Sequence, residues 1–188
     1  MEPVLQKLVE DACRSLQTLA LQEDTFQRIA AAAVATLKSG GKILTCGNGG
    51  SAADALHLAE ELVGHFRNDR RPLPAVSLVA DATLLTCIGN DYSFDEIFSR
   101  QVEGLASKND LLVCFSTSGN SPNILRAINA AKTKGVKCVA FLGKGGGKSK
   151  GKADYEIVID NSDSGRIQEA HTLLLHALLE VIEREITA

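Results

Sequence analysis

The sequence predicts a single α/β domain in which a five-stranded parallel sheet lies between layers of helices. After residue 41, five short apolar runs alternate with longer segments of helical periodicity. The runs are continuously apolar, which is typical of strands covered on both faces, as in a parallel sheet. The 188 residues suit one core of ordinary size and contain neither a repeat nor a linker, so we expect residues 1–188 to form one domain.

Two helices are expected before the first strand. Between residues 4 and 19, apolar side chains recur at the spacing of one helical face. Asp24 followed by Gln27 is a variant of the capping box, which predicts that a second helix begins there. This helix should continue through an alanine-rich stretch to Leu37 and end at Gly40 and Gly41.

The strands and the last helix follow from the remaining patterns. The five apolar runs comprise residues 43–46, 76–79, 111–115, 136–142 and 155–159. Residues 166–186 have the periodicity of a long amphipathic helix. The first and last helices offer more apolar surface than one small sheet covers, which favours association with copies of the same chain.

Composition and charge exclude several classes of function. Hydrophobic residues make up 45% and charged residues 23% of the chain, as in ordinary globular proteins. The net charge of −3 provides no broad basic field for nucleic acid. The apolar runs are too short to span a bilayer, and the N-terminus lacks the basic region of a signal peptide. We therefore expect a cytoplasmic protein that binds neither nucleic acid nor a membrane.

The cysteine pattern is that of reduced core thiols. No two cysteines form a CxxC pair, and three of them lie inside apolar runs that resemble buried strands. The five are Cys13, Cys46, Cys87, Cys114 and Cys138.

A glycine-rich loop joins the first strand to a helix. Its bare N–H groups and the positive end of the helix dipole favour a phosphate; the loop comprises Asn48, Gly49, Gly50 and Ser51. Residues 47–52 also fit the dinucleotide pattern G-x-G-x-x-G/A. However, the acidic residue that follows the second strand, Asp81, lies 29 positions beyond Ala52, and the pattern requires about 20. A plain tight turn is the remaining alternative.

Four hydroxyl groups crowd the turn after the third strand. They belong to Ser116, Thr117, Ser118 and Ser121. Pro122 suits the first position of a helix, with Ser121 as its N-cap. An ordinary capped turn needs one hydroxyl, and both loops follow the carboxyl ends of parallel strands, where open α/β sheets bind ligands. We therefore expect the second loop to bind a phosphate.

A third glycine-rich stretch, residues 143–152, resembles the end of a nucleotide-binding P-loop at Gly147, Lys148 and Ser149. The required first glycine is replaced by Leu142, and the next strand begins too soon for the obligatory helix. We expect a flexible basic loop instead, of a kind that can steer an anionic substrate towards the site.

Two pairs of polar residues have the spacing of metal ligands. His57 and Glu61 are four residues apart and share one helical face, although a solvated ion pair has the same spacing. Gln168 and His176, eight residues apart on a leucine-rich helix, need partners if they are buried. Asp54 could orient the His57 imidazole, or it could simply be stabilised by the dipole of its own helix.

Four segments in this order resemble the successive signatures of the phosphoheptose isomerases, which are members of the sugar isomerase (SIS) domain family. The segments are CGNGGSAADALHLAEEL, IGNDYSFDEIFSRQVE, STSGNSPNILRAI and RIQEAHTLLLH. The resemblance covers essentially the whole chain. It implies a three-layer, flavodoxin-like SIS domain and a homotetramer to which the N-terminal helices contribute. It also implies conversion of sedoheptulose 7-phosphate to D-glycero-D-manno-heptose 7-phosphate, the first step towards ADP-heptose or GDP-heptose for bacterial lipopolysaccharide and related surface polysaccharides.

The resemblance also assigns site residues. One zinc ion per subunit would be held by His57, Glu61, Gln168 and His176. Substrate contacts would come from Asn48, Gly49, Gly50, Ser51, Glu61, Asn90, Asp91, Ser116, Thr117, Ser118, Ser121 and Gln168. Eight residues along a helix span about 12 Å, so Gln168 and His176 would share a metal more readily if ligands came from different chains. Some relatives have Asp at Gly165 and Arg at His65, so contacts at these two positions are not carried over.

An aldose–ketose isomerisation needs a base, an acid and a group that stabilises oxyanion charge. We expect Glu61 to remove the carbon-bound proton, His176 to transfer the proton to and from oxygen, and the metal to polarise the carbonyl. Two alternatives remain: a non-catalytic regulator similar to the DnaA-initiator-associating protein, and an isomerase of another sugar phosphate. Glu61 and His176 argue against the regulator, because a binding module needs neither.

Overall fold

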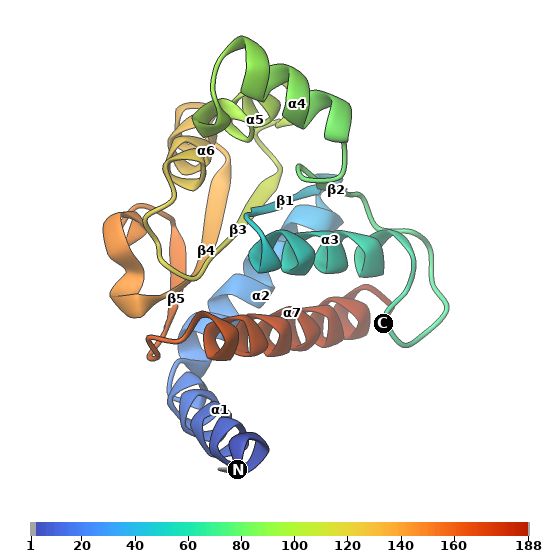
Figure 1. The fold of residues 1–188 in the computed structure, drawn as a ribbon. Coiled ribbons are helices and arrows are strands. Elements are labelled where there is room, and N and C mark those ends of the chain that lie inside the picture. Colours follow the sequence, from blue (N-terminus) through green and yellow to red (C-terminus); the bar gives the residue numbers. More distant parts are fainter. Residues whose placement is uncertain (1–2, 188) are drawn as a thin grey trace.

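The computed structural model describes residues 3–187, which form a three-layer α/β fold (Figure 1). Its five strands are all parallel and lie in the order β2-β1-β3-β4-β5. They are β1 (Ile43–Gly47), β2 (Ala75–Ser77), β3 (Leu111–Ser116), β4 (Lys137–Gly143) and β5 (Tyr155–Ile159). The predicted five-stranded parallel sheet is therefore confirmed.

Helices cover both faces of the sheet, and successive strand residues point into the two cores in turn. In β1, Ile43 belongs to the core under one helical layer, and Leu44 belongs to the core under the other. The first layer consists of α1 (Val4–Ala20), α2 (Glu23–Lys38), α3 (Gly50–Val63) and α7 (Ser164–Thr187). The second layer consists of α4 (Ala82–Asp91), the 3-10 turn η1 (Phe94–Glu96), α5 (Ser99–Leu105) and α6 (Pro122–Thr133).

The strand order places a topological switch point beside β1. The chain runs from β1 to β2 on one side and then returns to form β3 on the other side of β1. In open α/β sheets, ligands bind outside the carboxyl ends of the strands at such a point. The first two candidate phosphate loops follow β1 and β3 directly, so the fold brings them together at this edge.

The second strand differs from its prediction. It spans Ala75–Ser77, whereas the apolar run predicted residues 76–79. The strand β2 lies at the edge of the sheet and pairs only with β1, and its central residue, Val76, is 38% exposed.

The capping box predicted at Asp24 is wrong. The helix α2 begins at Glu23, and no side chain caps it. Only Leu21 and Gln22 separate α1 from α2, so Asp24 already lies within the first turn. Gln27 instead donates its Nε2–H to Glu23 Oε1, at 2.5 Å on the next turn of the helix.

The side chain of Gln22 contacts the backbone of the other edge strand, β5. Its Nε2 donates to the Val158 carbonyl oxygen at 3.0 Å, and its Oε1 accepts from the Val158 N–H at 3.3 Å. One side-chain amide therefore satisfies both backbone groups of one residue on the open edge of the sheet.

Three of the five cysteines form a buried row of free thiols across β1, β3 and β4. The Cys114 Sγ lies 3.4 Å from that of Cys46 and 3.9 Å from that of Cys138. The hydrogen bond with Cys114, together with burial, raises the pKa of the Cys138 thiol well above its ordinary value. The predicted reduced core thiols are confirmed for these three residues, whereas Cys13 and Cys87 are exposed.

The helix α1 carries an exposed apolar face. Val4, Leu5, Leu8 and Val9 are exposed by 64%, 76%, 42% and 52%. None of the described helices combines the length and the apolar character that crossing a bilayer requires.

A neutral histidine of α7 lies in the core. His171 is fully buried, and its ring contacts those of Phe115 and Phe141. Its Nε2 lies 3.4 Å from the Leu142 carbonyl oxygen, and its Nδ1 has no hydrogen-bond partner within residues 3–187. Burial lowers the pKa of His171 from 6.5 to about 4.

We expect this histidine to make the protein acid-labile. Its pKa is depressed in the folded state, so the unfolded chain binds a proton first as the pH falls below 6.5. The stability contributed above pH 6.5 is therefore lost between pH 6.5 and about 4, and about 2 kcal/mol of it is gone by pH 5. Denaturant unfolding at pH 7 and pH 5, at fixed protein concentration, measures this loss. A His171→Gln variant should lose less stability over the same pH range, and equal losses would contradict the explanation.

Candidate active site

The loop after β1 is shaped by glycines that other residues cannot replace. Gly49, the N-cap of α3, has a φ of +57°, which L side chains rarely adopt. A Cβ on Gly50 would lie 2.3 Å from Gln168 Nε2, so the start of α3 packs closely against α7. No side chain caps α3. The N–H groups of Ser51 and Ala52 donate to the carbonyl oxygens of Asn48 and Gly49 at 3.0 Å. The attraction of this helix start for an anion therefore comes mainly from the positive end of the helix dipole.

The loop after β3 holds its hydroxyls in a compact turn. Ser116 is buried, and its Oγ accepts the Gly119 N–H at 3.1 Å. Ser118 Oγ accepts the Asn120 N–H at the same distance. Both hydroxyls keep their own O–H to donate. Ser121 is the N-cap of α6 and Pro122 its first residue, as predicted, but the Ser121 side chain does not cap the helix.

A reciprocal amide pair joins these two loops. Asn48 Nδ2 donates to Asn123 Oδ1 at 2.8 Å, and Asn123 Nδ2 donates to Asn48 Oδ1 at 2.9 Å. Asn123 is 1% exposed and lies in the first turn of α6. Sequence reasoning missed this residue. A polar side chain at an otherwise apolar helix position was its only signal.

The third glycine-rich stretch packs against the second loop. It forms the 3-10 turn η2 (Lys144–Ser149), in which Gly145, Gly146 and Gly147 all have positive φ. Ser149 donates its N–H to the Gly119 carbonyl oxygen at 2.9 Å, and Lys148 donates its N–H to Asn120 Oδ1 at 3.0 Å. The next element after η2 is the strand β5 and not an α-helix, which agrees with the rejection of a P-loop.

The helices α3 and α7 run side by side and in the same direction (Figure 1). Their contacts advance in step along both helices: Gln168 meets Gly50, and Thr172 donates its hydroxyl to Asp54 Oδ1 at 2.9 Å. One turn further on, the rings of His176 and His57 lie 5.0 Å apart, edge to face.

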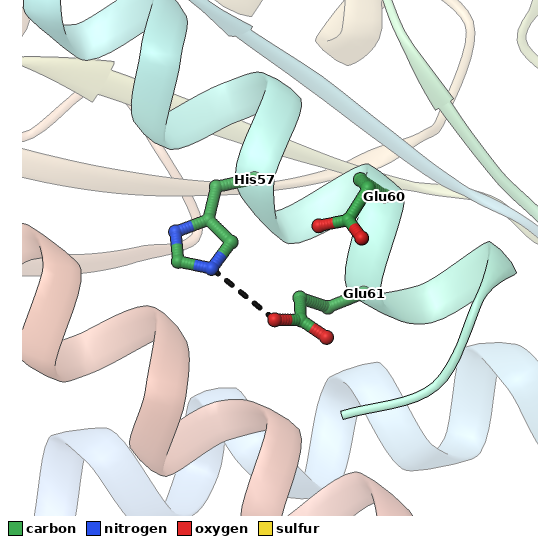
Figure 2. Close-up of side chains that lie close together, drawn as sticks. All are labelled: His57, Glu60 and Glu61. Atoms are coloured by element: carbon green, nitrogen blue, oxygen red, sulfur yellow. Dashed lines mark hydrogen bonds and ion pairs between the residues drawn. The ribbon is translucent and has the colours of Figure 1, made fainter. Parts of the chain in front are cut away.

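The candidate metal ligands gather in the second half of this helix pair. Figure 2 shows His57 and Glu61 on one face of α3, with His57 Nε2 3.3 Å from Glu61 Oε1. Glu60 lies beside them, and one ligand atom from each of the three residues lies within 4.8 Å of the others. His57, Glu61 and His176 can offer two imidazole nitrogens and a carboxylate, a set that fits zinc and leaves a position for a further ligand.

Gln168 lies apart from this cluster within one chain. Its amide packs on Gly50, seven residues before His57, which is about 10 Å along α3. Of the four predicted zinc ligands, His57 and Glu61 have ligand atoms 3.3 Å apart, and the ring centroid of His176 lies 5.0 Å from that of His57. Gln168 of the same chain lies beside the first phosphate loop.

Asp54 is buried between α3 and α7. Thr172 binds its Oδ1, while its Oδ2 has no hydrogen-bond partner within the described part of the chain. Burial raises the pKa of the Asp54 carboxyl, and the Thr172 hydrogen bond and the charge of His57 oppose this shift. The alternative was an aspartate stabilised by the dipole at the first turn of its own helix, but α3 begins at Gly50 and has no acidic residue in its first turn.

Asn90 and Asp91 lie on the other side of the sheet, at the exposed end of α4. Asn90 Nδ2 donates to Asp91 Oδ1 at 2.8 Å, and neither side chain is hydrogen-bonded to a phosphate loop within residues 3–187. Asp81 caps the beginning of α4 by accepting the N–H groups of Thr83 and Leu84. Because its carboxylate is engaged as a helix cap, Asp81 does not have the free position that the dinucleotide alternative requires.

A family model and individual relatives place the chain in the same family. The model of the SIS domain matches residues 9–143. The phosphoheptose isomerase of Aliarcobacter butzleri is 47% identical over 165 residues, which are 88% of this chain and 87% of that protein. The phosphoheptose isomerase of Campylobacter concisus is 51% identical over 148 residues, which are 79% of this chain and 78% of its own.

Solved structures share the whole fold. A phosphoheptose isomerase from Francisella tularensis superposes with a TM-score of 0.92 at 34% identity, over 96% of both chains. The phosphoheptose isomerase from Neisseria gonorrhoeae gives a TM-score of 0.89 at 39% identity, over 97% of this chain and 98% of its own. The predicted three-layer fold is thus confirmed by solved structures as well as by the strand order.

Proposed function

Because the chain belongs to the SIS domain family and, within it, to the phosphoheptose isomerases, we propose that it converts sedoheptulose 7-phosphate to D-glycero-D-manno-heptose 7-phosphate. This is the first step towards the ADP-heptose or GDP-heptose that bacterial surface polysaccharides require. The supporting observation is the cluster of His57, Glu61 and His176 on the helix pair that begins at the first phosphate loop.

The substrate phosphate is held at the carboxyl ends of β1 and β3. The positive end of the α3 dipole attracts it, and the hydroxyls of the second loop provide donors for it. The pair formed by Asn48 and Asn123 keeps the two loops in fixed relation. Lys144 and Lys148 in the adjoining basic turn favour the approach of an anion.

We expect Ser116→Ala to weaken substrate binding more than it slows the chemical step. The hydroxyl donates to a charged phosphate, a bond that contributes about 1.5–3 kcal/mol. KM should therefore rise about 10-fold to 150-fold while kcat changes little. Steady-state kinetics with sedoheptulose 7-phosphate measure both constants. An unchanged KM would remove Ser116 from the phosphate site.

His57, Glu61 and His176 would hold a zinc ion, with Gln168 contributed by a neighbouring subunit. Bound zinc supplies Lewis acidity that polarises the substrate carbonyl. The imidazoles and the carboxylate are the ligand types that zinc takes in catalytic sites.

The proton moves between two neighbouring carbon atoms through an enediol. Glu61 removes the proton from one carbon, and the same carboxyl group returns it to the other. His176 moves a proton between the two substrate oxygens. Asp54, buried one turn before His57, orients that imidazole through the local charge.

The direct test is turnover of sedoheptulose 7-phosphate by the purified protein, followed by NMR of the aldoheptose phosphate, before and after treatment with a zinc chelator. Loss of turnover on chelation, with recovery on addition of zinc, is the expected result. Equal turnover before and after chelation would support the proposed reaction and refute a role for zinc in it. No turnover with added zinc would refute the proposed reaction and favour a regulator or an isomerase of another sugar phosphate, which a substrate screen distinguishes.

We also propose a homotetramer. The exposed apolar face of α1 needs a partner, and the distance of Gln168 from His57 is bridged if the site combines two chains. Light scattering should give a mass about four times the 20.0 kDa of the chain. A monomeric protein would contradict the assignment of Gln168 as a zinc ligand, because Gln168 reaches the site only from a second chain.

A further inference from the structure

The loop that follows α3 is held by one carboxylate from α7. Glu183 accepts the N–H groups of Phe66 at 2.9 Å, Arg67 at 3.2 Å and Asn68 at 3.3 Å. It also accepts the Nε–H of Arg70 at 3.1 Å. The Arg70 and Glu183 side chains are only 2% and 4% exposed, so this is a buried ion pair within one chain.

The other end of the Arg70 guanidinium closes the last turn of α3. Its Nη2 donates to the Glu61 carbonyl oxygen at 2.7 Å, and its Nη1 donates to that of Leu62 at 3.0 Å. These carbonyls belong to the end of the helix, where intrahelical donors run out. Arg70 therefore fixes the backbone of Glu61, the proposed catalytic base, relative to α7.

Phe66 connects this network to the proposed catalytic cluster. Its ring stacks on that of His176, with centroids 5.5 Å apart and an angle of 22° between the planes. His176 in turn meets His57 edge to face. The side chain of Phe66 therefore covers one face of the His176 ring. The backbone N–H of Phe66 is bound by Glu183, which lies seven residues after His176 on α7.

The chemistry of this network goes beyond what packing requires. A buried ion pair often contributes no more stability than apolar residues of the same volume, so its presence points to a geometric role. Burial alone would raise the pKa of the Glu183 carboxyl. The N–H groups of Phe66, Arg67 and Asn68 and the charge of Arg70 outweigh burial and lower that pKa, so the carboxylate is charged at neutral pH.

We propose that Arg70 and Glu183 are positioning residues that hold Phe66 against His176 and the end of α3 behind Glu61, so that the imidazole and the carboxylate keep one relative orientation. The inference rests on the proposed function for its catalytic meaning. The position of the rings can be measured without turnover.

The test uses Phe66→Leu, Phe66→Tyr, Glu183→Gln and, as a matched control, Glu180→Gln. Glu180 pairs with Arg67 at the surface, where its side chain is 50% exposed. The chain has four histidines, so the Cε1–H signals of labelled histidine can be assigned by substitution. A stacked aromatic ring moves the His176 signal upfield. Phe66→Leu and Glu183→Gln should abolish this shift, whereas Phe66→Tyr and Glu180→Gln should keep it.

Kinetics and zinc affinity provide the second readout. Phe66→Leu and Glu183→Gln should lower kcat at least tenfold with less than a threefold change in KM, and weaken zinc binding in chelator competition by a similar factor. Phe66→Tyr should restore both values. If Glu183→Gln does not fold, Arg70→Lys takes its place. The Phe66 variants test the inference independently of both, because Phe66 is only half-buried.

Wild-type zinc affinity and an unchanged His176 signal in Phe66→Leu would overturn the inference. An inactive wild-type protein that shows the Phe66-dependent shift would refute the proposed reaction alone. The two failures are therefore distinguishable.

Discussion

Glu61→Gln should abolish nearly all turnover while leaving the fold intact. The amide keeps the volume of the carboxylate but cannot accept the carbon-bound proton, and it is a poorer ligand for zinc. A general base contributes about 10²–10⁴-fold to a rate. We therefore expect kcat to fall about 10³-fold or more, which corresponds to a barrier higher by about 4 kcal/mol. Single-turnover measurement with excess enzyme separates this loss from slow product release.

Glu60→Gln is the informative comparison for this variant. Glu60 precedes Glu61 directly and belongs to the same cluster, but its side chain is exposed and makes no hydrogen bond with His57 among the interactions of the described residues. We expect a loss of less than tenfold. A loss as large as that of Glu61→Gln would transfer the role of base or ligand to Glu60. Circular dichroism and thermal melting must show that both variants are folded.

Gly119→Ala should damage the phosphate site from within the backbone. Gly119 has a φ of +61°, and an added Cβ would lie 2.0 Å from the Gly146 carbonyl oxygen of η2. The Cβ is fixed directly to the backbone of Gly119, and the group that it meets is also backbone, so the second loop and the basic turn must separate. We expect KM to rise more than tenfold, because the hydroxyls of Ser116 and Ser118 are no longer held in their positions relative to each other.

Gly135→Ala is the matched control for Gly119→Ala. Gly135 follows α6 with a φ of +67°, and an added Cβ would meet nothing within 4 Å. Both variants therefore carry the cost of a left-handed alanine, about 1 kcal/mol in stability. Only Gly119→Ala adds the collision with η2. Equal KM values for the two variants would show that the contact with η2 does not organise the phosphate loop.

The sequence was sufficient for the sheet because strands that are covered on both faces have a local signal. The runs at 43–46 and 111–115 are apolar except for Thr45, and the glycine and hydroxyl loops that follow them mark their carboxyl ends. The edge strand β2 has weaker local signals because it is only three residues long and its central residue is exposed, and its predicted bounds were displaced. The positions of the first two phosphate loops followed from the parallel topology alone.

The arrangement of the site depends on contacts that no local pattern records. The register between α3 and α7 decides which of their residues meet. It places His176 against His57 and Gln168 against Gly50, although about a hundred residues separate the two helices in the sequence. Asn123 and Phe66 have ordinary sequence surroundings, and their roles arise only from distant partners. The zinc assignment and the substrate contacts remain proposals that the variants above can test.

The contact between Gln22 and Val158 has a consequence for how molecules meet one another. A parallel sheet that is open at both sides offers unpaired backbone groups to any extended chain, which is a route to aggregation. At β5, the Gln22 amide already occupies the hydrogen-bonding groups of Val158. At the opposite side, β2 is only three residues long. Neither border of the sheet is therefore a ready template for a sixth strand, so concentrated protein should assemble through helical surfaces and not through strand addition.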